Sequence, residues 1–492
     1  RVYRPAIVVG HSQTGEIDKI DGPYYFFKLI QKMRNALPPW VPTIGIEGGR
    51  INIVPVDFVV HALDHIAHKK GLDGGCFHLT DPEPRRIGEI LNLFAKAAHA
   101  PQMTMRVNAK MFSFIPSFVV DSLMSLAPVR RIQKQVLADL GIPKDMFTFV
   151  NYPTRFDTRE AEKALKGTGI RVPPLEDYAW RLWDYWERHL DPDLFIDRSL
   201  EGKVNGKVVV VTGGTSGIGE ATAYKLAEAG AHVVVVARDP EKAAPVLEKI
   251  KAEGGKAKFV SCDLSSLDDC DKLVATVKKE FGRIDYLVNN AGRSIRRGIA
   301  SSYDRFHDFE RTMQLNYFGS LRLIMGFMPM MVAQGGGHVI NISSIGVLTR
   351  APRFSAYVAS KAALDAWSDC AASEFIDNNV YFTTINMPLV KTPMIAPTKL
   401  YNHVPTLSPE QAADLVVEAI VYRPVRIATR LGVFGEILHA VAPKATQILL
   451  NTAFRMFPDS GAAKGKKGEE AKEVELTPEQ IAFAQITQGI HW

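Results

Sequence analysis

The chain has 492 residues, which is too long for one ordinary hydrophobic core and predicts two or more domains. Hydrophobic residues make up 46% and charged residues 23% of the chain, a balance typical of folded globular proteins and not of disordered ones. The net charge of +6 is small for this length, so it does not indicate a nucleic-acid-binding protein, whereas it suits anionic ligands or membrane surfaces.

The cysteine content points to a reducing compartment. The four cysteines are Cys76, Cys262, Cys270 and Cys370, and no pair has the spacing of a metal site. We interpret them as free thiols of a cytoplasmic protein and expect no bound metal. No secretory signal is visible, and the best candidate for a membrane span, residues 112–129, is interrupted by an aspartate and two prolines.

The first 195 residues are expected to form one domain. Strands are predicted at 6–10 and 75–79, a helix at 57–70, and mainly helices from 85 to 190. The aromatic run at 178–186 has the spacing of one helix face packed on a core. Because the chain opens without methionine and directly in an apolar strand, we interpret it as a fragment that begins inside this domain.

A polar, turn-rich stretch at 196–206 is the expected linker to a second domain at 207–400. Its strands are predicted at 208–212, 232–237, 257–261, 286–289, 337–342 and 381–386. Alternating βα units with strands buried on both faces predict an α/β domain with a doubly wound parallel sheet, the Rossmann arrangement. An apolar helical extension is expected at 401–460, then a flexible linker at 461–476 and a short helix at 477–492.

A glycine-rich loop follows the first strand of the second domain and opens a helix. Glycines let the backbone turn sharply and approach a pyrophosphate, which then lies at the helix N-terminus. The combination of strand, loop and helix predicts a dinucleotide site. The expected contacts are Gly213, Thr215, Ser216, Gly217, Ile218 and Gly219.

The next strand ends in Ala237 and Arg238, at the position where an NAD-selective fold usually has an acidic residue. An arginine can hold a 2′-phosphate with two hydrogen bonds. We therefore expect NADP(H) as cofactor; the alternative is that Arg238 is a solvated surface charge.

Tyr357 and Lys361 are four residues apart on a predicted helix, so their side chains share one face. A nearby ammonium group favours the phenolate, which lets the tyrosine exchange a proton near neutral pH. Tyr24 and Lys28 have the same spacing but lie in no comparable context, and we interpret that second match as chance.

The order and spacing of these motifs make residues 205–400 resemble the compact branch of the short-chain dehydrogenase/reductase superfamily. The motifs are Thr212 to Gly219, Asn289-Asn290-Ala291-Gly292, Leu315-Asn316-Tyr317, Ser343-Ser344, and Tyr357 with Lys361. Their combination is far more specific than any one of them.

The resemblance implies catalytic roles. Tyr357 would donate the proton to the substrate oxygen as hydride arrives, and Lys361 would hold the nicotinamide ribose and lower the tyrosine pKa. Ser344 would hydrogen-bond the carbonyl oxygen, with the adjacent Ser343 as the alternative. Asn316 would help to organise a proton-relay water.

The resemblance also implies contacts with the cofactor. Asp263 and Leu264 would border the adenine, and Asn289 would support the central strand. The remaining expected contacts are Asn290, Ala291, Gly292, Tyr357, Lys361, Pro388, Val390 and Thr392. Leu389 stands where the family commonly has glycine, so the pocket edge is expected to differ.

Residues 386–398, together with the extension after 400, resemble bacterial fatty acyl-CoA reductases. Segments 4–10 and 54–59 look like the late part of an extended-type Rossmann reductase domain, whose own glycine-rich loop and tyrosine–lysine pair would lie before Arg1. Together they resemble the two-domain bacterial long-chain fatty acyl-CoA reductases. The resemblance implies NADPH-dependent reduction of a long-chain acyl-CoA to an aldehyde by the second domain, and on to a fatty alcohol by the first. Without the residues before Arg1 the first domain is expected to be inactive, and with them it would be a second active site.

A CoA substrate needs cations for its phosphates. The candidates are Arg293, Arg296, Arg297, Arg350 and Arg353, with solvated loop charges as the alternative. The apolar helices at 431–457 would cover an acyl chain, lie peripherally on a membrane, or pack in a core or an oligomer interface. Helices near 305–330 and 357–375 would form the dimer face usual in the family, so a homo-oligomer is expected.

Two other functions stay open. One is a reductase of fatty aldehydes or of a 3-oxoacyl or steroid-type ketone, which needs no thioester chemistry. The other is a lipid-binding scaffold with a vestigial reductase fold, against which the presence of Ser344, Tyr357 and Lys361 argues.

Overall fold

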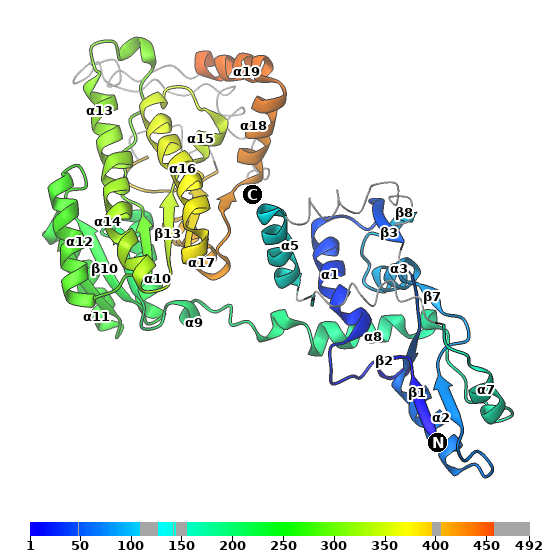
Figure 1. Ribbon diagram of the computed structural model, residues 1–492. Coiled ribbons are helices and arrows are strands. Elements are labelled where there is room, and N and C mark those ends of the chain that lie inside the picture. The colour runs from blue at the N-terminus through cyan, green and yellow to red at the C-terminus, as the bar shows by residue number, and fades with distance from the viewer. Residues whose placement is uncertain (48, 109–125, 141, 144–154, 396–404, 457–492) are drawn as a thin grey trace. The chain divides into compact units, whose positions relative to one another are not determined.

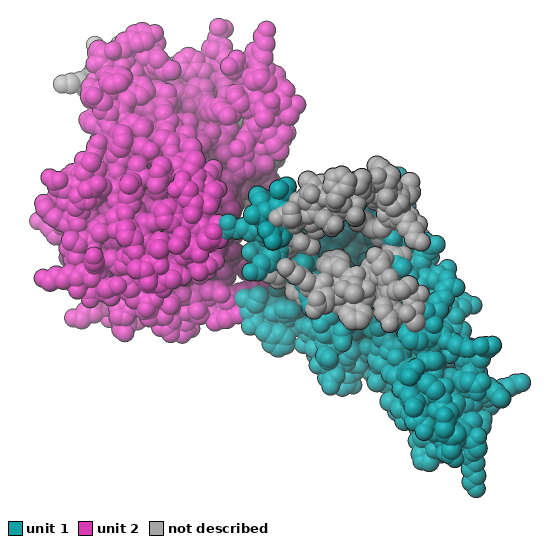
Figure 2. Space-filling model, in the orientation of Figure 1, with its two compact units in different colours: residues 1–196 teal, residues 197–492 magenta. Residues whose placement is uncertain are grey.

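The computed structural model describes residues 1–47, 49–108, 126–140, 142–143, 155–395 and 405–456. The chain divides into two compact units, Arg1–Ile196 and Asp197–Trp492 (Figure 2). The stretch predicted as a linker contains helix α9 (Leu200–Val204), whose Val204 is fully buried in the core of the second unit. The second unit therefore begins before the first strand of its sheet.

The first unit pairs its short strands two by two. Three pairs are parallel: β1 (Val2–Pro5) with β6 (Cys76–Leu79), β2 (Ile7–Val9) with β5 (Ile53–Pro55), and β3 (Thr43–Glu47) with β8 (Met103–Asn108). One pair, β4 (Arg50–Ile51) with β7 (Arg85–Arg86), is antiparallel. The helices are α1 (Phe27–Ala36), α2 (Val56–His68), α3 (Ile87–Ala97), α5 (Ala127–Leu140), α7 (Arg159–Leu165) and α8 (Leu175–His189).

Helix α8 carries the aromatic run that the sequence predicts to pack on a core. Tyr178, Trp183 and Trp186 are buried against Phe27 of α1 and Phe94 of α3, which confirms the packing role of one face. Trp180 lies on the other face and is 53% exposed. The period of 3.6 residues separates the two faces.

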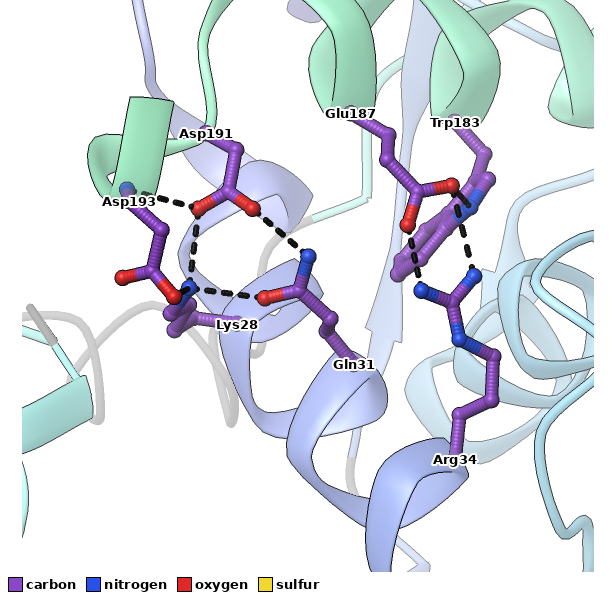
Figure 3. Close-up of polar contacts among 7 residues, drawn as sticks. All are labelled: Lys28, Gln31, Arg34, Trp183, Glu187, Asp191 and Asp193. Atoms are coloured by element: carbon purple, nitrogen blue, oxygen red, sulfur yellow. Dashed lines mark hydrogen bonds and ion pairs between the residues drawn. The ribbon is translucent and has the colours of Figure 1, made fainter. Parts of the chain in front are cut away.

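Polar contacts fix α8 and the residues after it to α1 (Figure 3). Lys28 Nζ contacts carboxylate oxygens of Asp191 and Asp193, each at 2.8 Å. Gln31 Nε2 donates to Asp191 Oδ2 at 2.6 Å. The Tyr24 hydroxyl accepts a hydrogen bond from the Gly10 amide at 3.0 Å. Tyr24 and Lys28 therefore have separate structural partners, in agreement with their interpretation as a chance match to the catalytic spacing.

The second unit is built on one seven-stranded parallel sheet with the order β11-β10-β9-β12-β13-β14-β15. The strands are β9 (Val208–Thr212), β10 (His232–Ala237), β11 (Lys256–Ser261), β12 (Tyr286–Asn289), β13 (Gly337–Ile342), β14 (Val380–Asn386) and β15 (Arg426–Ala428). The six strands predicted from the sequence are confirmed to within one residue. The doubly wound Rossmann arrangement is confirmed as well.

Alternate side chains of each strand enter separate hydrophobic cores on the two faces of the sheet. Val209 and Val211 pack with α10 (Gly217–Glu228), α11 (Pro240–Ala252) and α17 (Pro409–Tyr422). Val208 and Val210 pack with α12 (Leu267–Phe281), α14 (Ser320–Ala333) and α16 (Ser355–Phe375). Helices thus cover both faces of the sheet (Figure 1).

The region predicted as an extension after residue 400 is partly integral to the sheet. Strand β15 pairs in parallel with β14, and α17 packs into one core, because its alanine and valine face is buried. Helices α18 (Arg430–Val441) and α19 (Pro443–Met456) follow, with α18 against α15 (Ile345–Thr349). The linker and helix predicted at 461–492 lie outside the described residues.

The search for a membrane span covers the described residues, which leaves out most of the candidate at 112–129. Within them, no helix has the length and apolar character needed to cross a bilayer.

Candidate functional site

The site lies at the carboxyl edge of the sheet, between the central strands β9 and β12. From β9 the chain continues to β10 and β11 on one side of the sheet, and it then crosses back to β12 on the other side of β9. Ligands of doubly wound folds bind at such switch points. The predicted glycine-rich loop follows β9, and the predicted Asn290-Ala291-Gly292 segment follows β12.

The glycine-rich loop needs glycine for two different reasons. Gly217, the first residue of α10, has a φ of +57°, which side chains rarely adopt. Gly219 leaves no space, because a Cβ there would lie 2.3 Å from the carbonyl oxygen of Gly213. Asn290 Nδ2 donates to the carbonyl oxygens of Thr212 and Gly213 at 3.0 and 3.3 Å, which joins the ends of β9 and β12.

Tyr357 and Lys361 lie one turn apart on α16, as predicted. Tyr357 is half-buried, whereas Lys361 is 4% exposed and its Nζ donates to the carbonyl oxygen of Ile342 at 2.7 Å. Burial lowers the pKa of Lys361 to about 8, and the charge of Asp365 partly opposes this change. The lysine can therefore change its charge near neutral pH.

Ser344 and Ser343 follow β13 and have different surroundings. Ser344 is half-buried and caps α15, because its Oγ accepts from the Gly346 amide at 3.1 Å. That contact uses a lone pair and not the hydroxyl proton. Ser343 is buried and donates to Asp365 Oδ2 at 2.6 Å. Ser343 therefore uses its hydroxyl proton within the fold, and Ser344 stays the candidate for contact with a substrate.

Asn316 is fully buried in a π-helical turn, Gln314–Gly319, which joins α13 (His307–Met313) to α14. Its Oδ1 accepts from the Arg293 amide at 2.8 Å, and its Nδ2 contacts the Arg293 carbonyl oxygen and Ser360 Oγ, each at 2.9 Å. A Cβ on Gly292 would lie 3.3 Å from Asn316 Oδ1 and 3.4 Å from Lys361 Nζ. Asn316 thus lies near Lys361 and holds the loop after β12.

A cavity of about 810 Å³ joins these elements, a size that suits a small-molecule site. Predicted residues that line it are Gly213, Ser216, Gly217, Ile218, Asn290, Ala291, Gly292, Arg296, Arg297, Ser344, Tyr357, Lys361, Pro388, Val390 and Thr392. Its apolar wall includes Ile345, Phe354, Leu389, Met394 and Ile395. Leu389, the departure noted in the sequence, therefore forms part of the pocket edge.

Comparisons with known proteins agree with this geometry. Residues 207–401 match the short chain dehydrogenase family, and residues 1–63 match the family described as male sterility protein. A fatty acyl-CoA reductase of Acinetobacter baylyi is 52% identical over 289 residues, which cover 59% of this chain and 96% of the relative. The chain belongs to the short-chain dehydrogenase/reductase family.

Two further similarities concern this family. A fatty acyl-CoA reductase of Mycobacterium tuberculosis is 46% identical over 264 residues, which cover 53% of this chain and 90% of the relative. The crystal structure of a metagenomic short-chain oxidoreductase in complex with NADP is 33% identical, with a TM-score of 0.40 over 44% of this chain and 92% of that one.

As a short-chain dehydrogenase/reductase, the protein is an oxidoreductase with a Rossmann fold that binds a nicotinamide dinucleotide. The residues present fit such a cofactor. Gly213 and Gly219 approach each other closely and carry no side chains, so the loop backbone is open to a pyrophosphate. The residues at the N-terminus of α10 line the cavity. Among the described residues, no group of three or more histidine, cysteine or acidic side chains is placed to hold a metal ion.

The other predicted cofactor residues surround the loop without lining the cavity. Arg238 is exposed at the end of β10. Asp263 is half-buried and accepts a hydrogen bond from the Ser265 amide at 2.9 Å, next to the buried Leu264. Thr215 is half-buried within the loop. These positions suit the adenosine part of a dinucleotide, and their roles stay predictions.

The predicted substrate arginines have different surroundings. Arg296 and Arg297 line the cavity, and the backbone of Arg293 is held by Asn316. Arg353 is buried, and its guanidinium lies over the ring of Phe454 at 4.0 Å and donates to the Phe454 carbonyl oxygen at 2.9 Å. Arg353 therefore attaches α19, which makes it a weaker candidate for contact with CoA.

Asp365 and Asn386 were not predicted, although both contact Ser343, the neighbour of Ser344. Asn386 Nδ2 lies 3.5 Å from both Ser343 Oγ and Asp365 Oδ2 and 3.4 Å from the Ser344 carbonyl oxygen. Burial raises the pKa of Asp365 to about 6, against the hydrogen bond from Ser343 and the charge of Lys361. The spacing of four residues between Lys361 and Asp365 could have indicated that their charges interact.

Proposed function

We propose that the protein uses NADPH to reduce a long-chain fatty acyl-CoA to the aldehyde and on to the fatty alcohol, with the thioester step in the second unit. The observation that carries the proposal is the single cavity that joins the glycine-rich loop, Ser344, Tyr357 and Lys361 to an apolar wall. The 52% identical relative is named a fatty acyl-CoA reductase, and its match of 289 residues is longer than the first unit, so it includes part of the second.

The proposed chemistry places one proton and one developing negative charge at the substrate oxygen. Bound NADPH supplies the hydride. The Ser344 hydroxyl donates to the oxygen that becomes negative, and Tyr357 gives it a proton. The buried Lys361 ammonium stabilises the phenolate that Tyr357 leaves behind. Hydride and proton convert the thioester to an aldehyde and release the CoA thiol, and a second hydride and proton convert the aldehyde to an alcohol.

The cavity lining supports a substrate with an apolar tail and a polar head. Phe354, Met394 and Ile395 offer an apolar surface to an acyl chain, while Arg296 and Arg297 offer positive charge. For the cofactor, the exposed Arg238 stands where an NAD-selective fold has an acid, which supports NADPH over NADH. Reduction of the aldehyde is assigned, as in the sequence analysis, to the extended-type reductase domain of which residues 1–195 form the late part.

Helices α18 and α19 support a peripheral contact with a membrane. Their exposed apolar side chains are Phe434, Ile437, Val441, Ile448, Leu449 and Phe454. Lys444 and Arg455 add positive charge, and Glu436 is paired with Arg426. Such a surface suits an anionic lipid bilayer, from which a long-chain substrate can enter. Exposed Phe318, in the π-helical turn before α14, and Met325, within α14, similarly support the expected homo-oligomer.

The proposal is tested by NADPH oxidation with palmitoyl-CoA in the wild-type protein and in Tyr357→Phe. We expect the variant to lose about 100-fold or more of the turnover, because it lacks the proton donor, and to bind NADPH with little change. Tyr303→Phe, at an 84% exposed tyrosine, is the matched control and should retain activity. Full turnover by Tyr357→Phe would contradict the mechanism, whereas absence of turnover in the wild-type protein would favour the scaffold alternative.

A further inference from the structure

One buried carboxylate in the second unit faces more positive charge than it can neutralise. Asp308, in the first turn of α13, is 3% exposed. It accepts a hydrogen bond from Arg305 Nε at 3.2 Å, pairs with Arg311, and lies 3.8 Å from Arg297 Nε. His307 Nε2 lies 3.4 Å from the same carboxylate. The side chains of Arg305 and Arg311 are 35% and 52% exposed, so water also solvates them, whereas that of Arg297 is 15% exposed. Three guanidinium groups face one carboxylate, which gives the cluster a net positive charge that suits a further anion.

Arg297 is the least satisfied member of this cluster. Its side chain is 15% exposed, and its Nε and Nη1 atoms are buried with no hydrogen-bond partner in the part of the chain that the structure describes. The 3.8 Å separation from Asp308 is too long for a hydrogen bond. Guanidinium N–H groups are costly to leave without acceptors, and these two atoms are out of reach of solvent. We therefore expect the side chain, which lines the cavity, to turn toward acceptors that a ligand supplies.

Arg297 also has a fixed place at the cavity. Its amide donates to the Arg353 carbonyl oxygen at 2.7 Å, and it lines the cavity together with Arg296. Ser344 and Tyr357 line the same cavity, as do the apolar residues that suit an acyl chain. If the reacting carbonyl of the substrate lies at Ser344 and its acyl tail lies on the apolar wall, the charged CoA portion lies near the arginines.

We propose that Arg297, supported through Asp308 by Arg305 and Arg311, binds a phosphate group of the CoA portion of the substrate. This inference rests on the proposed function and adds the residue that recognises the substrate head. An arginine fork can donate two parallel hydrogen bonds to one phosphate. A phosphate also supplies the negative charge that the cluster lacks, which the uncharged pantetheine arm does not.

The test compares three substrates at saturating NADPH in the wild-type protein and in Arg297→Gln. The substrates are palmitoyl-CoA, palmitoyl-pantetheine (the same thioester without phosphates) and hexadecanal. We expect the KM for palmitoyl-CoA to rise about tenfold or more, because a charged hydrogen bond is lost, while the KM for the other two changes less than about twofold. Arg297→Lys keeps the charge and should recover part of the loss.

The matched control is Arg283→Gln, which removes a different arginine–carboxylate pair, with Asp285, at the opposite edge of the sheet. It should leave all three KM values unchanged. An equal loss on both thioesters would assign Arg297 to the pantetheine arm or to the fold of the second unit, and a loss on hexadecanal as well, whose reduction is assigned to the first unit, would show a general loss of folded protein. Either result would overturn the phosphate site.

A binding measurement separates this inference from the proposed function. Free CoA is titrated by calorimetry into the wild-type protein and into Arg297→Gln, each saturated with NADP⁺. We expect about tenfold weaker binding in the variant, and unchanged affinity would overturn the inference. If the wild-type protein releases no thiol from palmitoyl-CoA, the proposed function fails, while this titration still decides the phosphate site.

Discussion

The Ser343 hydroxyl donates a 2.6 Å hydrogen bond to Asp365 Oδ2, one helical turn beyond Lys361 on α16. This bond joins the end of β13, where Ser344 follows, to the helix that carries the tyrosine–lysine pair. Asp365 also places a carboxylate near the buried ammonium group, so the charge of each residue depends on the other. The charges of Lys361 and Asp365 are therefore expected to change with pH together.

Asp365→Asn should move the alkaline limb of the activity profile to lower pH. Lys361 must be charged to stabilise the phenolate, and its pKa of about 8 is held up by Asp365. Removal of that carboxylate lowers the lysine pKa further, so activity falls earlier as pH rises. The measurement is kcat/KM against pH at saturating NADPH. Glu374→Gln, at an exposed acid on the same helix, should keep the wild-type profile; an unmoved limb in Asp365→Asn would contradict the account.

The same substitution should change how stability depends on pH. The pKa of Asp365 in the folded protein is about 6, above its ordinary 3.8, so the folded state binds more protons between these values. The contribution of this group to stability is therefore present at low pH and is lost as pH rises through that window. In Asp365→Asn the loss should disappear from thermal unfolding measured between these pH values. A wild-type dependence in the variant would show that another group causes it.

Gly217→Ala should weaken NADPH binding more than it weakens the fold. Its positive φ costs an alanine about 1–2 kcal/mol, and the added Cβ would lie 2.9 Å from Thr392 Cγ2 at the cavity. Gly254→Ala is the matched control, because Gly254 has a φ of +80° with no atom within 4 Å of the added Cβ. Unfolding should show a similar loss in both variants, whereas we expect about tenfold weaker NADPH binding in Gly217→Ala alone. Equal NADPH affinity in the two variants would count against this loop as the pyrophosphate site.

Arg238→Gln should raise the KM for NADPH and leave the KM for NADH unchanged. Loss of a charged hydrogen bond to the 2′-phosphate corresponds to about a tenfold effect or more. Lys251→Gln, at an exposed cation near the end of α11, is the control. A KM that rises equally for both cofactors, or for neither, would show that Arg238 does not select the phosphate.

Replacement of Ile448 and Leu449 by glutamine should weaken binding to vesicles that contain anionic lipid by about tenfold, because both side chains are more than half exposed and apolar. Cosedimentation with vesicles measures the effect. Val60→Gln, at a 55% exposed apolar residue on α2, should bind like the wild-type protein. Binding that does not differ between these variants would rule out α19 as the contact.

The sequence predicts the sheet of the second unit well for a physical reason. Parallel strands buried on both faces are short unbroken apolar runs, as in Val208–Thr212, and turns and helices separate them clearly. Strand β15 was missed because Arg426–Ala428 is too short to show any period. The glycine-rich loop, Ser344, Tyr357 and Lys361 were predicted because fixed spacings bring them to one edge of the sheet.

The remaining site residues depend on contacts that no spacing reveals. Asn386 reaches Ser343 from a strand 43 residues later, and Lys28 meets Asp191 across 163 residues. The cluster around Asp308 depends on the path of the loop after β12, which places Arg297 beside a helix that begins ten residues later. Tertiary packing determines which of these distant residues meet, and the pattern of a single sequence does not reveal that packing.

The central claim is tested most directly by following thiol release and NADPH oxidation together with palmitoyl-CoA as substrate. Thiol release that matches NADPH loss would establish thioester reduction, and a ratio of about two NADPH per thiol would show that the alcohol is the product, since each reduction step uses one hydride. A ratio of about one would show that the reaction ends at the aldehyde. No thiol release, together with turnover of decanal, would contradict thioester reduction and would assign the protein as an aldehyde reductase instead.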